Sequence, residues 1–249
     1  MLEKEIGARL TRCGIAYDAA LPGLLARYHA LLLQWNERMD LTAVTEEAEM
    51  IDRHYVDSLM ALTIPGLIPE TGALIDVGTG AGLPGLPLAM ARPKLQVTLL
   101  DAQQKRLRFL QAVIDELHLS NVTLVHARAE DGARREELRE RFDRAVARAV
   151  APLPVLAEYL LPCVRVGGQA VCWKGPALAE ELTAGRRAAH LLGGRAEEPI
   201  PCVLPGREWN HLLLPIQKVE KTARQYPRKA GTPGKSPLGA SDSARAPRP

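Results

Sequence analysis

The chain has 249 residues, 47% of them hydrophobic and 24% charged, which suits one soluble α/β domain with an extension. No apolar run approaches the roughly 20 residues that cross a membrane, and the N-terminal MLEKEIGARL lacks the apolar core of a secretory signal. We therefore expect a cytoplasmic protein without a membrane partner. The cysteines are scattered without metal-ligand spacing, so we expect reduced core thiols, no disulfide framework and no metal site: Cys13, Cys163, Cys172 and Cys202.

Charge is unevenly distributed along the chain. Residues 221–249 carry a net charge of +6, so residues 1–220 carry −3. The basic segment is also rich in Pro, Gly and Ser, which predicts a flexible tail. It is either an arm for a polyanion or a solvated tail without a partner, and charge alone favours neither.

Residues 1–70 are predicted to be mostly helical. Apolar residues between Leu21 and Trp35 follow the three-to-four spacing of a buried helix face, and a second helix is expected over Glu46–Ala61. Four neighbouring polar side chains lie in this second helix: Arg53, His54, Asp57 and Ser58. Such a group either faces a ligand or forms a capping and packing network.

From residue 71 onward, short apolar strands alternate with helical segments. The expected strands are Leu74–Val77, Leu95–Asp101, Val122–His126, Phe142–Ala149, Gln169–Lys174, Pro199–Leu204 and His211–Val219. The expected helices between them are Gln103–Leu117, Pro154–Leu161 and Ala177–Leu192. This order predicts a doubly wound, mostly parallel, seven-stranded α/β sheet over residues 71–220 whose last pair includes an antiparallel strand.

A glycine-rich turn follows the first expected strand. Gly78, Gly80 and Gly82 alternate there, so the backbone can approach a nucleotide-like ligand closely. The spacing over residues 80–85 also matches the dinucleotide fingerprint GxGxxG, a weak signal by itself. Asp76 precedes the first glycine, and an acid before GxGxG is shared by methyltransferases that use S-adenosylmethionine. The aspartate can meet the methionine amine of that cofactor, directly or through water.

Two later strand ends complete a site for an adenosine cofactor. Asp101 ends the second strand, where a carboxylate accepts both ribose hydroxyls; this fits NAD and S-adenosylmethionine equally. Its alternative role is to cap the following helix. The loop after the third strand usually lies over the adenine, which makes Ala129 and Glu130 candidate contacts.

Polar residues also end the fourth and fifth strands. Arg148 follows a central parallel strand, so it is expected to point into the ligand cleft; its alternative is a structural ion pair with Asp101 or Glu130. Trp173 either stacks a flipped base or is buried in the sheet. Lys174 follows it at the same edge.

At this point the sequence resembles a known family, the bacterial 16S ribosomal RNA guanine-N7 methyltransferases, also called glucose-inhibited division protein B. The similar segments cover nearly all of residues 1–240: LLLQWNERMDLTAVT, RHYVDSL, residues 74–93, LLDAQQKRLRFL, HARAED, AVARAVAPL, CWKGP and YPRKAGTPGKSPL. The resemblance implies a Rossmann-like class I methyltransferase with an N-terminal helical extension. It would move a methyl group from S-adenosylmethionine to N7 of a guanine in the 530 loop of 16S RNA.

The resemblance also implies roles for individual residues. The cofactor contacts would be Gly78, Gly80, Leu83, Asp101, Ala129, Glu130 and Arg148, with Asp76 before them. Arg128 and Lys174 match basic positions that would act on the RNA or the reacting guanine. Arg148, from its place at a strand end, either binds the cofactor or donates to guanine O6. Because aromatic residues are few, we expect the RNA to meet mainly basic residues, namely Lys105, Arg106, Arg128, Arg134, Arg135 and the tail. The RNA would be part of the small ribosomal subunit or an assembly intermediate, and we expect a monomer.

The sequence departs from the family at two positions and leaves three other functions open. Asp40 stands where the family has Asn, and Asn210 stands where it has Arg, with Arg207 a nearby substitute. The alternatives are a small-molecule methyltransferase, a nicotinamide oxidoreductase and a non-catalytic RNA-binding protein. The oxidoreductase would bind its cofactor without Asp76, which separates it from the methyltransferases.

Overall fold

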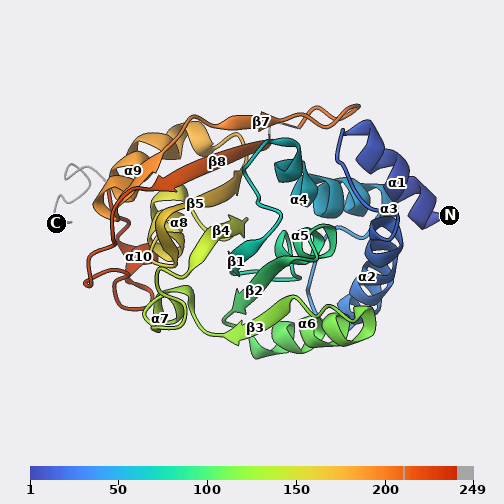
Figure 1. Cartoon of the computed structure of the whole chain (residues 1–249), viewed down its shortest axis with the longest axis horizontal. Coiled ribbons are helices and arrows are strands. Elements are labelled where there is room, and N and C mark those ends of the chain that lie inside the picture. The colour runs from blue at the N-terminus through green and yellow to red at the C-terminus, as the bar shows by residue number, and fades with distance from the viewer. Residues whose placement is uncertain (210, 240–249) are drawn as a thin grey trace, which may run out of the picture.

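The computed structural model describes residues 1–209 and 211–239, and its centre is a mixed sheet (Figure 1). The described strands are β1 (Gly72–Val77), β2 (Leu95–Asp101), β3 (Val122–His126), β4 (Phe142–Arg148), β5 (Val164–Lys174), β6 (Gly194–Ala196), β7 (Ile200–Cys202) and β8 (His211–Lys218). Their order is β3-β2-β1-β4-β5-β8-β6, and β7 also pairs with β8. The first five strands are parallel, whereas β8 runs antiparallel to β5, β6 and β7.

The predicted doubly wound α/β sheet is therefore confirmed, with one correction. All seven expected strands are present, but the described part of the chain has eight because β6 adds a short edge strand. That strand has three residues, too few to show an apolar pattern, and is defined by its pairing with the end of β8.

The N-terminal region forms helices, as expected. They are α1 (Leu2–Arg12), α2 (Leu21–Asn36) and a continuous helical segment made of α3 (Glu47–Met50), the π-helical η1 (Ile51–Val56), α4 (Asp57–Leu59) and the 3-10 turn η2 (Met60–Thr63). In α2 the side chains of Leu21, Leu25, Tyr28 and Leu32 are fully buried. A π-helical turn widens a helix locally and is frequent at functional sites; here it carries Arg53 and His54.

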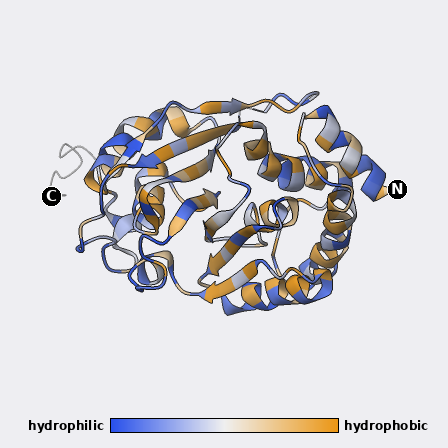
Figure 2. Cartoon of the chain, in the orientation of Figure 1, coloured by the Kyte–Doolittle hydropathy of each residue, from blue (hydrophilic) through white to orange (hydrophobic). Residues whose placement is uncertain are grey.

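Helices cover both faces of the sheet and enclose two hydrophobic clusters (Figure 1). The N-terminal helices, α5 (Gly85–Ala91) and α6 (Gln104–Leu117) cover one face, whereas α7 (Ala129–Gly132), α8 (Leu153–Leu160) and α9 (Leu178–Leu191) cover the other. Neighbouring strand residues alternate between the clusters: Leu74 packs in the first and Ile75 in the second. Figure 2 shows that the strands in the centre of the molecule carry many hydrophobic residues.

The C-terminal segment differs from the flexible tail that the composition predicts. Residues 221–239 pack on the domain and include α10 (Thr232–Lys235). The buried carboxylate of Glu158 accepts hydrogen bonds from the Arg228 backbone N (2.7 Å) and from Arg228 Nη2 (2.6 Å). Arg139 donates to the carbonyls of Thr222 and Tyr226, 2.8 Å each. The prediction is thus wrong for residues 221–239, and residues 240–249 lie outside the described chain.

The strand order places a ligand site at one edge of the sheet. The chain winds outward from β1 through β2 to β3, then returns to the other side of β1 with β4 and β5. Ligands of such sheets bind outside the carboxyl ends of the strands at this reversal. The crevice therefore lies between the residues that follow β1 and those that follow β4.

Candidate active site

The turn after β1 approaches its neighbours closely. The backbone N of Gly78 donates to the carbonyl of Leu100 at 2.8 Å, which ties the turn to β2. Gly78 and Gly80 have φ angles of +74° and +60°, a region that favours glycine. A Cβ at Gly85 would lie 2.7 Å from Asp76 Oδ2, so only glycine fits against this carboxylate.

Asp76 lies beneath the turn and organises it. Its Oδ2 accepts hydrogen bonds from Thr79 Oγ1 (2.7 Å) and from the Gly85 backbone N (2.8 Å). Its Oδ1 is buried without a hydrogen-bond partner among the described residues. Burial raises the pKa of the Asp76 carboxyl to about 6. The orphaned oxygen fits the predicted amine contact, because a cationic donor would satisfy it.

A first cavity of about 340 Å³ opens at the ends of β1 to β4. Its wall includes Val77, Gly78, Leu100, Asp101, Ala102, Gln103, Arg106, Ala127, Arg128, Ala129, Glu130, Ala149, Val150, Tyr159 and Gly231. The predicted residues Gly78, Asp101, Ala129 and Glu130 thus lie together. Gly80 and Leu83 do not line this cavity.

Asp101 is held firmly at the end of β2. Its Oδ1 accepts from the Gln103 backbone N at 2.8 Å, and its Oδ2 accepts from the Gly80 backbone N at 3.0 Å. Arg106 Nη1 also lies 3.5 Å from this Oδ2, which therefore already has two donors. Oδ1 has one donor and keeps a site for a ribose hydroxyl. Gly80 therefore contributes to the site through its backbone N, which positions the carboxylate of Asp101.

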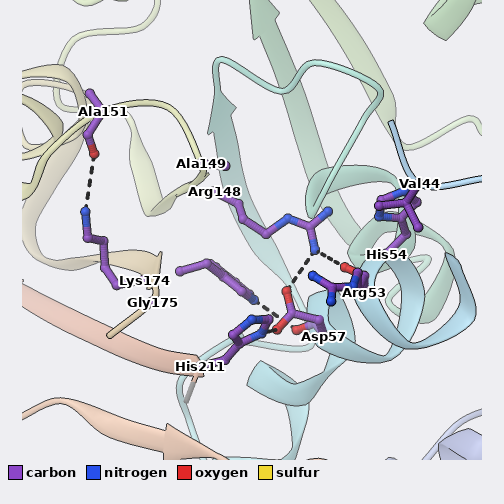
Figure 3. Close-up of a pocket in the computed structure, with 11 residues that line it drawn as sticks. Val44, Arg53, His54, Asp57, Arg148, Ala149, Ala151, Lys174, Gly175 and His211 are labelled. Atoms are coloured by element: carbon purple, nitrogen blue, oxygen red, sulfur yellow. Dashed lines mark hydrogen bonds and ion pairs between the residues drawn. The ribbon is translucent and has the colours of Figure 1, made fainter. Parts of the chain in front are cut away.

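A second cavity has a volume of about 370 Å³ (Figure 3). It is lined by Val44, Arg53, His54, Asp57, Arg148, Ala149, Ala151, Trp173, Lys174, Gly175 and His211. Ala149 lines both cavities, so they meet directly after β4. The polar residues of the second predicted helix therefore face a cavity, and only Ser58 is turned inward, donating to the carbonyl of His54.

Asp57 is the centre of the second cavity (Figure 3). Its Oδ2 accepts from Arg148 Nη1 at 2.8 Å, and its Oδ1 lies 2.8 Å from His211 Nδ1. The carbonyl of Asp57 accepts from Trp173 Nε1 at 2.9 Å. Burial opposes ionisation, but the hydrogen bond from His211 and the charge of Arg148 outweigh it and lower the pKa of Asp57. Asp57 is therefore an ionised acceptor.

The structure distributes the predicted basic residues between the two cavities. Arg148 lies in the second cavity, where it pairs with Asp57, and neither in the first cavity nor beside Asp101 or Glu130. Arg128 shows the opposite arrangement: it lines the first cavity, apart from Arg148 and Lys174. Sequence reasoning grouped these bases because it could not resolve two adjoining cavities.

The remaining predicted residues of the fifth strand have defined partners. Trp173 is 5% exposed, and its Nε1 donates to the carbonyl of Asp57, so it is a buried sheet residue that also contributes to the wall of the second cavity. Lys174 Nζ lies 2.6 Å from Glu181 Oε2 at the cavity wall.

Three cysteines are buried free thiols, and burial raises the pKa of each to about 12: Cys163, Cys172 and Cys202.

Some predicted RNA contacts have other duties. Arg207 Nη1 lies 2.5 Å from Glu49, and its Nη2 lies 2.7 Å from Asp52, so its charge is neutralised by the protein. Arg134 donates to the carbonyl of Pro227 and thereby holds the C-terminal segment. Asn210, the position of the family departure, lies outside the described residues.

Sequence reasoning missed several residues of the two cavities, among them His211, Tyr159 and Gly231. His211 begins β8, and it reaches the second cavity because β8 pairs antiparallel with the end of β5. Tyr159 on α8 and Gly231 in the C-terminal segment line the first cavity. Gly231 is held there by its backbone N, which donates to Glu130 Oε1 at 2.7 Å. The antiparallel last strand was the only signal that pointed to His211.

Fold and site together define a Rossmann-like protein with two neighbouring cavities at the carboxyl ends of its strands, the first of which is lined by acceptors that suit an adenosine cofactor. Among solved structures, TYW2 of M. jannaschii in complex with AdoMet is 15% identical, with a TM-score of 0.52 over 73% of this chain and 81% of that chain. A mutant of MtNAS has a TM-score of 0.53 over 87% and 81% of the two chains at 16% identity. These similarities concern the fold.

The sequence comparisons define the family. The chain belongs to the GidB family, described as rRNA small subunit methyltransferase G, whose model matches residues 23–208. A curated relative, the ribosomal RNA small subunit methyltransferase G of Alkaliphilus metalliredigens, is 50% identical over 86% of this chain and 89% of its own. The relative of that name from Leuconostoc mesenteroides is 42% identical over 96% and 100% of the two chains. The protein is thus a methyltransferase, and its cofactor is S-adenosylmethionine.

The first cavity fits that cofactor. Asp101 lines this cavity and has an acceptor for a ribose hydroxyl. Asp76 lies beneath the turn, outside the cavity wall, and its orphaned Oδ1 is an acceptor that an amine would satisfy. Ala129 and Glu130 provide the wall where an adenine lies in such folds.

No helix in the described parts of the chain is both long enough and apolar enough to cross a bilayer.

Asp76 predicts that cofactor binding releases protons near pH 6. The pKa of its carboxyl is about 6 in the free protein, and an ammonium beside Oδ1 would lower it. Binding at pH 6 should then release about half a proton, and affinity should rise from pH 5 to pH 7. Calorimetric titrations in two buffers of different ionisation enthalpy measure this release. Asp76→Asn should abolish it; a wild-type enthalpy that is the same in both buffers would contradict the role of Asp76.

Proposed function

We propose that this protein transfers the methyl group of S-adenosylmethionine to N7 of a guanine in the 530 loop of 16S ribosomal RNA. The observation that carries the proposal is the meeting of the two cavities at Ala149, next to Arg148. One cavity has the acceptors for an adenosine cofactor, and the other has the size and polar lining for a base. The family assignment supports small-subunit RNA as the substrate.

The residues of the second cavity suit N7 as the acceptor. S-adenosylmethionine supplies an electrophilic methyl group, and its sulfur keeps the electron pair of the broken bond as N7 forms the new one. N7 has a lone pair and no proton, so the protein needs no general base. Burial and the charge of Arg148 lower the pKa of His54 to about 4, and its Nε2 lies 2.9 Å from Thr42 Oγ1. Because no proton has to be removed, the protein needs only to hold N7 of the base in line with the methyl group and the sulfur.

Arg148 is the side chain next to the junction. Its Nη1 donates to Asp57 and to the carbonyl of Arg53, which fixes the guanidinium. A guanidinium is a strong donor toward guanine O6, the neighbour of N7. Asp57 offsets the positive charge of Arg148. Arg148 can therefore hold O6 and repel less strongly the positive charge that moves onto the base.

We further infer that the substrate is the small subunit or an assembly intermediate, that the enzyme acts as a monomer, and that it acts in the cytoplasm. Two arginines line the first cavity, Arg106, which is also paired with Asp101, and Arg128; a guanidinium is a donor suited to RNA phosphates. Binding should consequently weaken as salt rises.

The test is methyl transfer from labelled S-adenosylmethionine to small subunits that lack the modification, followed by nucleoside mass spectrometry and position mapping. Label in 7-methylguanosine from the 530 loop is the expected result. Label in another nucleoside would retain the fold and cofactor but refute the proposal. Free guanosine serves as the control that separates an RNA enzyme from a small-molecule methyltransferase.

Arg148→Met should slow transfer about 100-fold, because an oriented donor is lost. Cofactor affinity should stay within about twofold, since Arg148 does not line the first cavity. Single-turnover rates and a cofactor titration measure the two effects separately. Arg148→Lys is the matched variant, which keeps the charge and should recover part of the rate. A large loss of cofactor affinity in Arg148→Met would instead place Arg148 in the cofactor site.

A further inference from the structure

Asp57 and His211 form a hydrogen-bonded pair on the wall of the second cavity. His211 lies on the wall of the second cavity, its side chain 30% exposed, with Nδ1 2.8 Å from Asp57 Oδ1 (Figure 3). Asp57 is 3% exposed and comes from the N-terminal helical segment, whereas His211 comes from β8. Two distant parts of the chain are thus joined at the cavity by one carboxylate.

This pair fixes the tautomer of the imidazole. Asp57 is ionised and can only accept, so Nδ1 must carry a hydrogen. In the neutral ring Nε2 is then an acceptor with a free lone pair. The structure gives Nε2 no hydrogen-bond partner within residues 1–209 and 211–239, so it is available to a ligand.

A free acceptor is unusual in this cavity, where three of the charged side chains are donors. Arg53, Arg148 and Lys174 can only donate. The second histidine, His54, has its Nε2 engaged with Thr42. Asp57 has both carboxylate oxygens engaged, with Arg148 and with His211. His211 Nε2 is therefore an acceptor in this wall with no hydrogen-bond partner among the described residues, and it is free to recognise a donor on a base.

The edges of guanine match this arrangement. When N7 lies at the junction of the cavities, O6 is the next polar atom along the edge of the base, and N1–H follows O6. Arg148 begins at the junction, and Asp57 separates it from His211. A donor followed by an acceptor is the complement of O6 followed by N1–H. Adenine presents an amino donor and a bare N1 acceptor at the same places and would be rejected.

We propose that His211, held by Asp57, accepts a hydrogen bond from N1–H of the target guanine and so selects guanine and assists its methylation. The inference rests on the proposed function. Methylation at N7 makes the base cationic and its N1–H a stronger donor. The hydrogen bond to His211 therefore strengthens in the transition state, which is the condition for an interaction to increase the rate.

The experiment uses the full-length protein and small subunits reconstituted with 16S RNA that carries guanine or 2-aminopurine at the target. 2-Aminopurine keeps N7 but lacks O6 and N1–H. Three variants are compared with the wild type: His211→Leu removes the acceptor, His211→Gln restores one through its amide oxygen, and His54→Gln is the control from the same cavity. Single-turnover transfer rates and cofactor affinity are measured for each.

The wild type should prefer guanine strongly. His211→Leu should slow guanine methylation about 10- to 100-fold, the discrimination that one specific base contact provides, and should leave 2-aminopurine unchanged. His211→Gln should recover most of the guanine rate but accept 2-aminopurine better, because its amide also donates. His54→Gln should keep the wild-type preference, and cofactor affinity should not change in any variant.

Two results would overturn the inference in different ways. Equal slowing of both substrates in His211→Leu, or no slowing at all, would show that His211 does not read N1–H, although the methyltransferase remains. Absence of 7-methylguanosine with the wild type on guanine subunits would refute the proposed function itself. A guanine preference lost in His211→Leu and restored in His211→Gln would support both.

Discussion

Asp57→Asn should slow methyl transfer by about 100-fold or more while cofactor affinity changes little. The carboxylate holds Arg148 and His211 from opposite sides at 2.8 Å each, and small displacements of such groups have effects of this size. Asp57 acts through these side chains and is thus a positioning residue. The neutral amide removes the charge that balances Arg148 and no longer fixes the tautomer of His211.

Stability should fall in the same variant. Removing one partner of a buried ion pair costs about 3–5 kcal/mol, because the other charge is left uncompensated. Arg148 is partly open to the cavity, so we expect the lower end of that range. Urea unfolding measures the loss, and Asp115→Asn, an exposed carboxylate with one side-chain partner, is the control. A folded Asp57→Asn protein with wild-type transfer rates would contradict the positioning role.

Arg228→Met should destabilise the protein by about 3 kcal/mol and weaken cofactor binding. The side chain of Glu158 is fully buried, and Arg228 supplies its partners through the backbone N, Nε and Nη2. Loss of the guanidinium leaves the carboxylate without its charge partner. Three residues further on, Gly231 lines the cofactor cavity, so a loosened segment disturbs its wall.

The double variant Arg228→Met/Glu158→Gln separates charge from packing. If the penalty comes from the uncompensated carboxylate, neutralising Glu158 should restore part of the stability. Arg195→Met, which breaks an exposed ion pair with Glu197, should change the free energy of unfolding by less than about 1 kcal/mol. Thermal unfolding and a cofactor titration measure both quantities. A stable Arg228→Met protein with unchanged affinity would show that the C-terminal segment is dispensable for the site.

The first cavity could be predicted well from the sequence because its residues follow strand ends. Gly78 follows β1, Asp101 ends β2, and Ala129 and Glu130 begin the helix after β3; parallel strands bring these carboxyl ends to one edge. The local pattern of an apolar strand followed by glycine or an acid was therefore sufficient. Asp76 was found the same way, although the structure shows it beneath the turn and not on the cavity wall.

The second cavity could be predicted only in part because it depends on long-range packing. Arg148 and Lys174 were visible as strand ends, but their partners Asp57 and Glu181 come from helices. The position of His211 depends on the antiparallel register in which Trp173 pairs with Leu213. No local pattern contains that register.

The C-terminal segment was misjudged for a similar reason. Its composition is that of a flexible tail, but a single buried acid in α8, Glu158, gives its arginine a fixed place. Arg228 and Glu158 are 70 residues apart, beyond the range of any local pattern. Charge composition describes a segment's average solvation and not the individual partners that the fold provides.

The most direct test of the two-cavity account is a crystal structure of the protein with a non-reactive analogue of S-adenosylmethionine. The account predicts the ribose on Asp101, the adenine against Ala129 and Glu130, and the amine toward Asp76. The end that stands for the methyl group should point past Ala149 toward Arg148. An analogue bound among Arg148, Asp57 and His211, or one whose reactive end points away from that cavity, would contradict it.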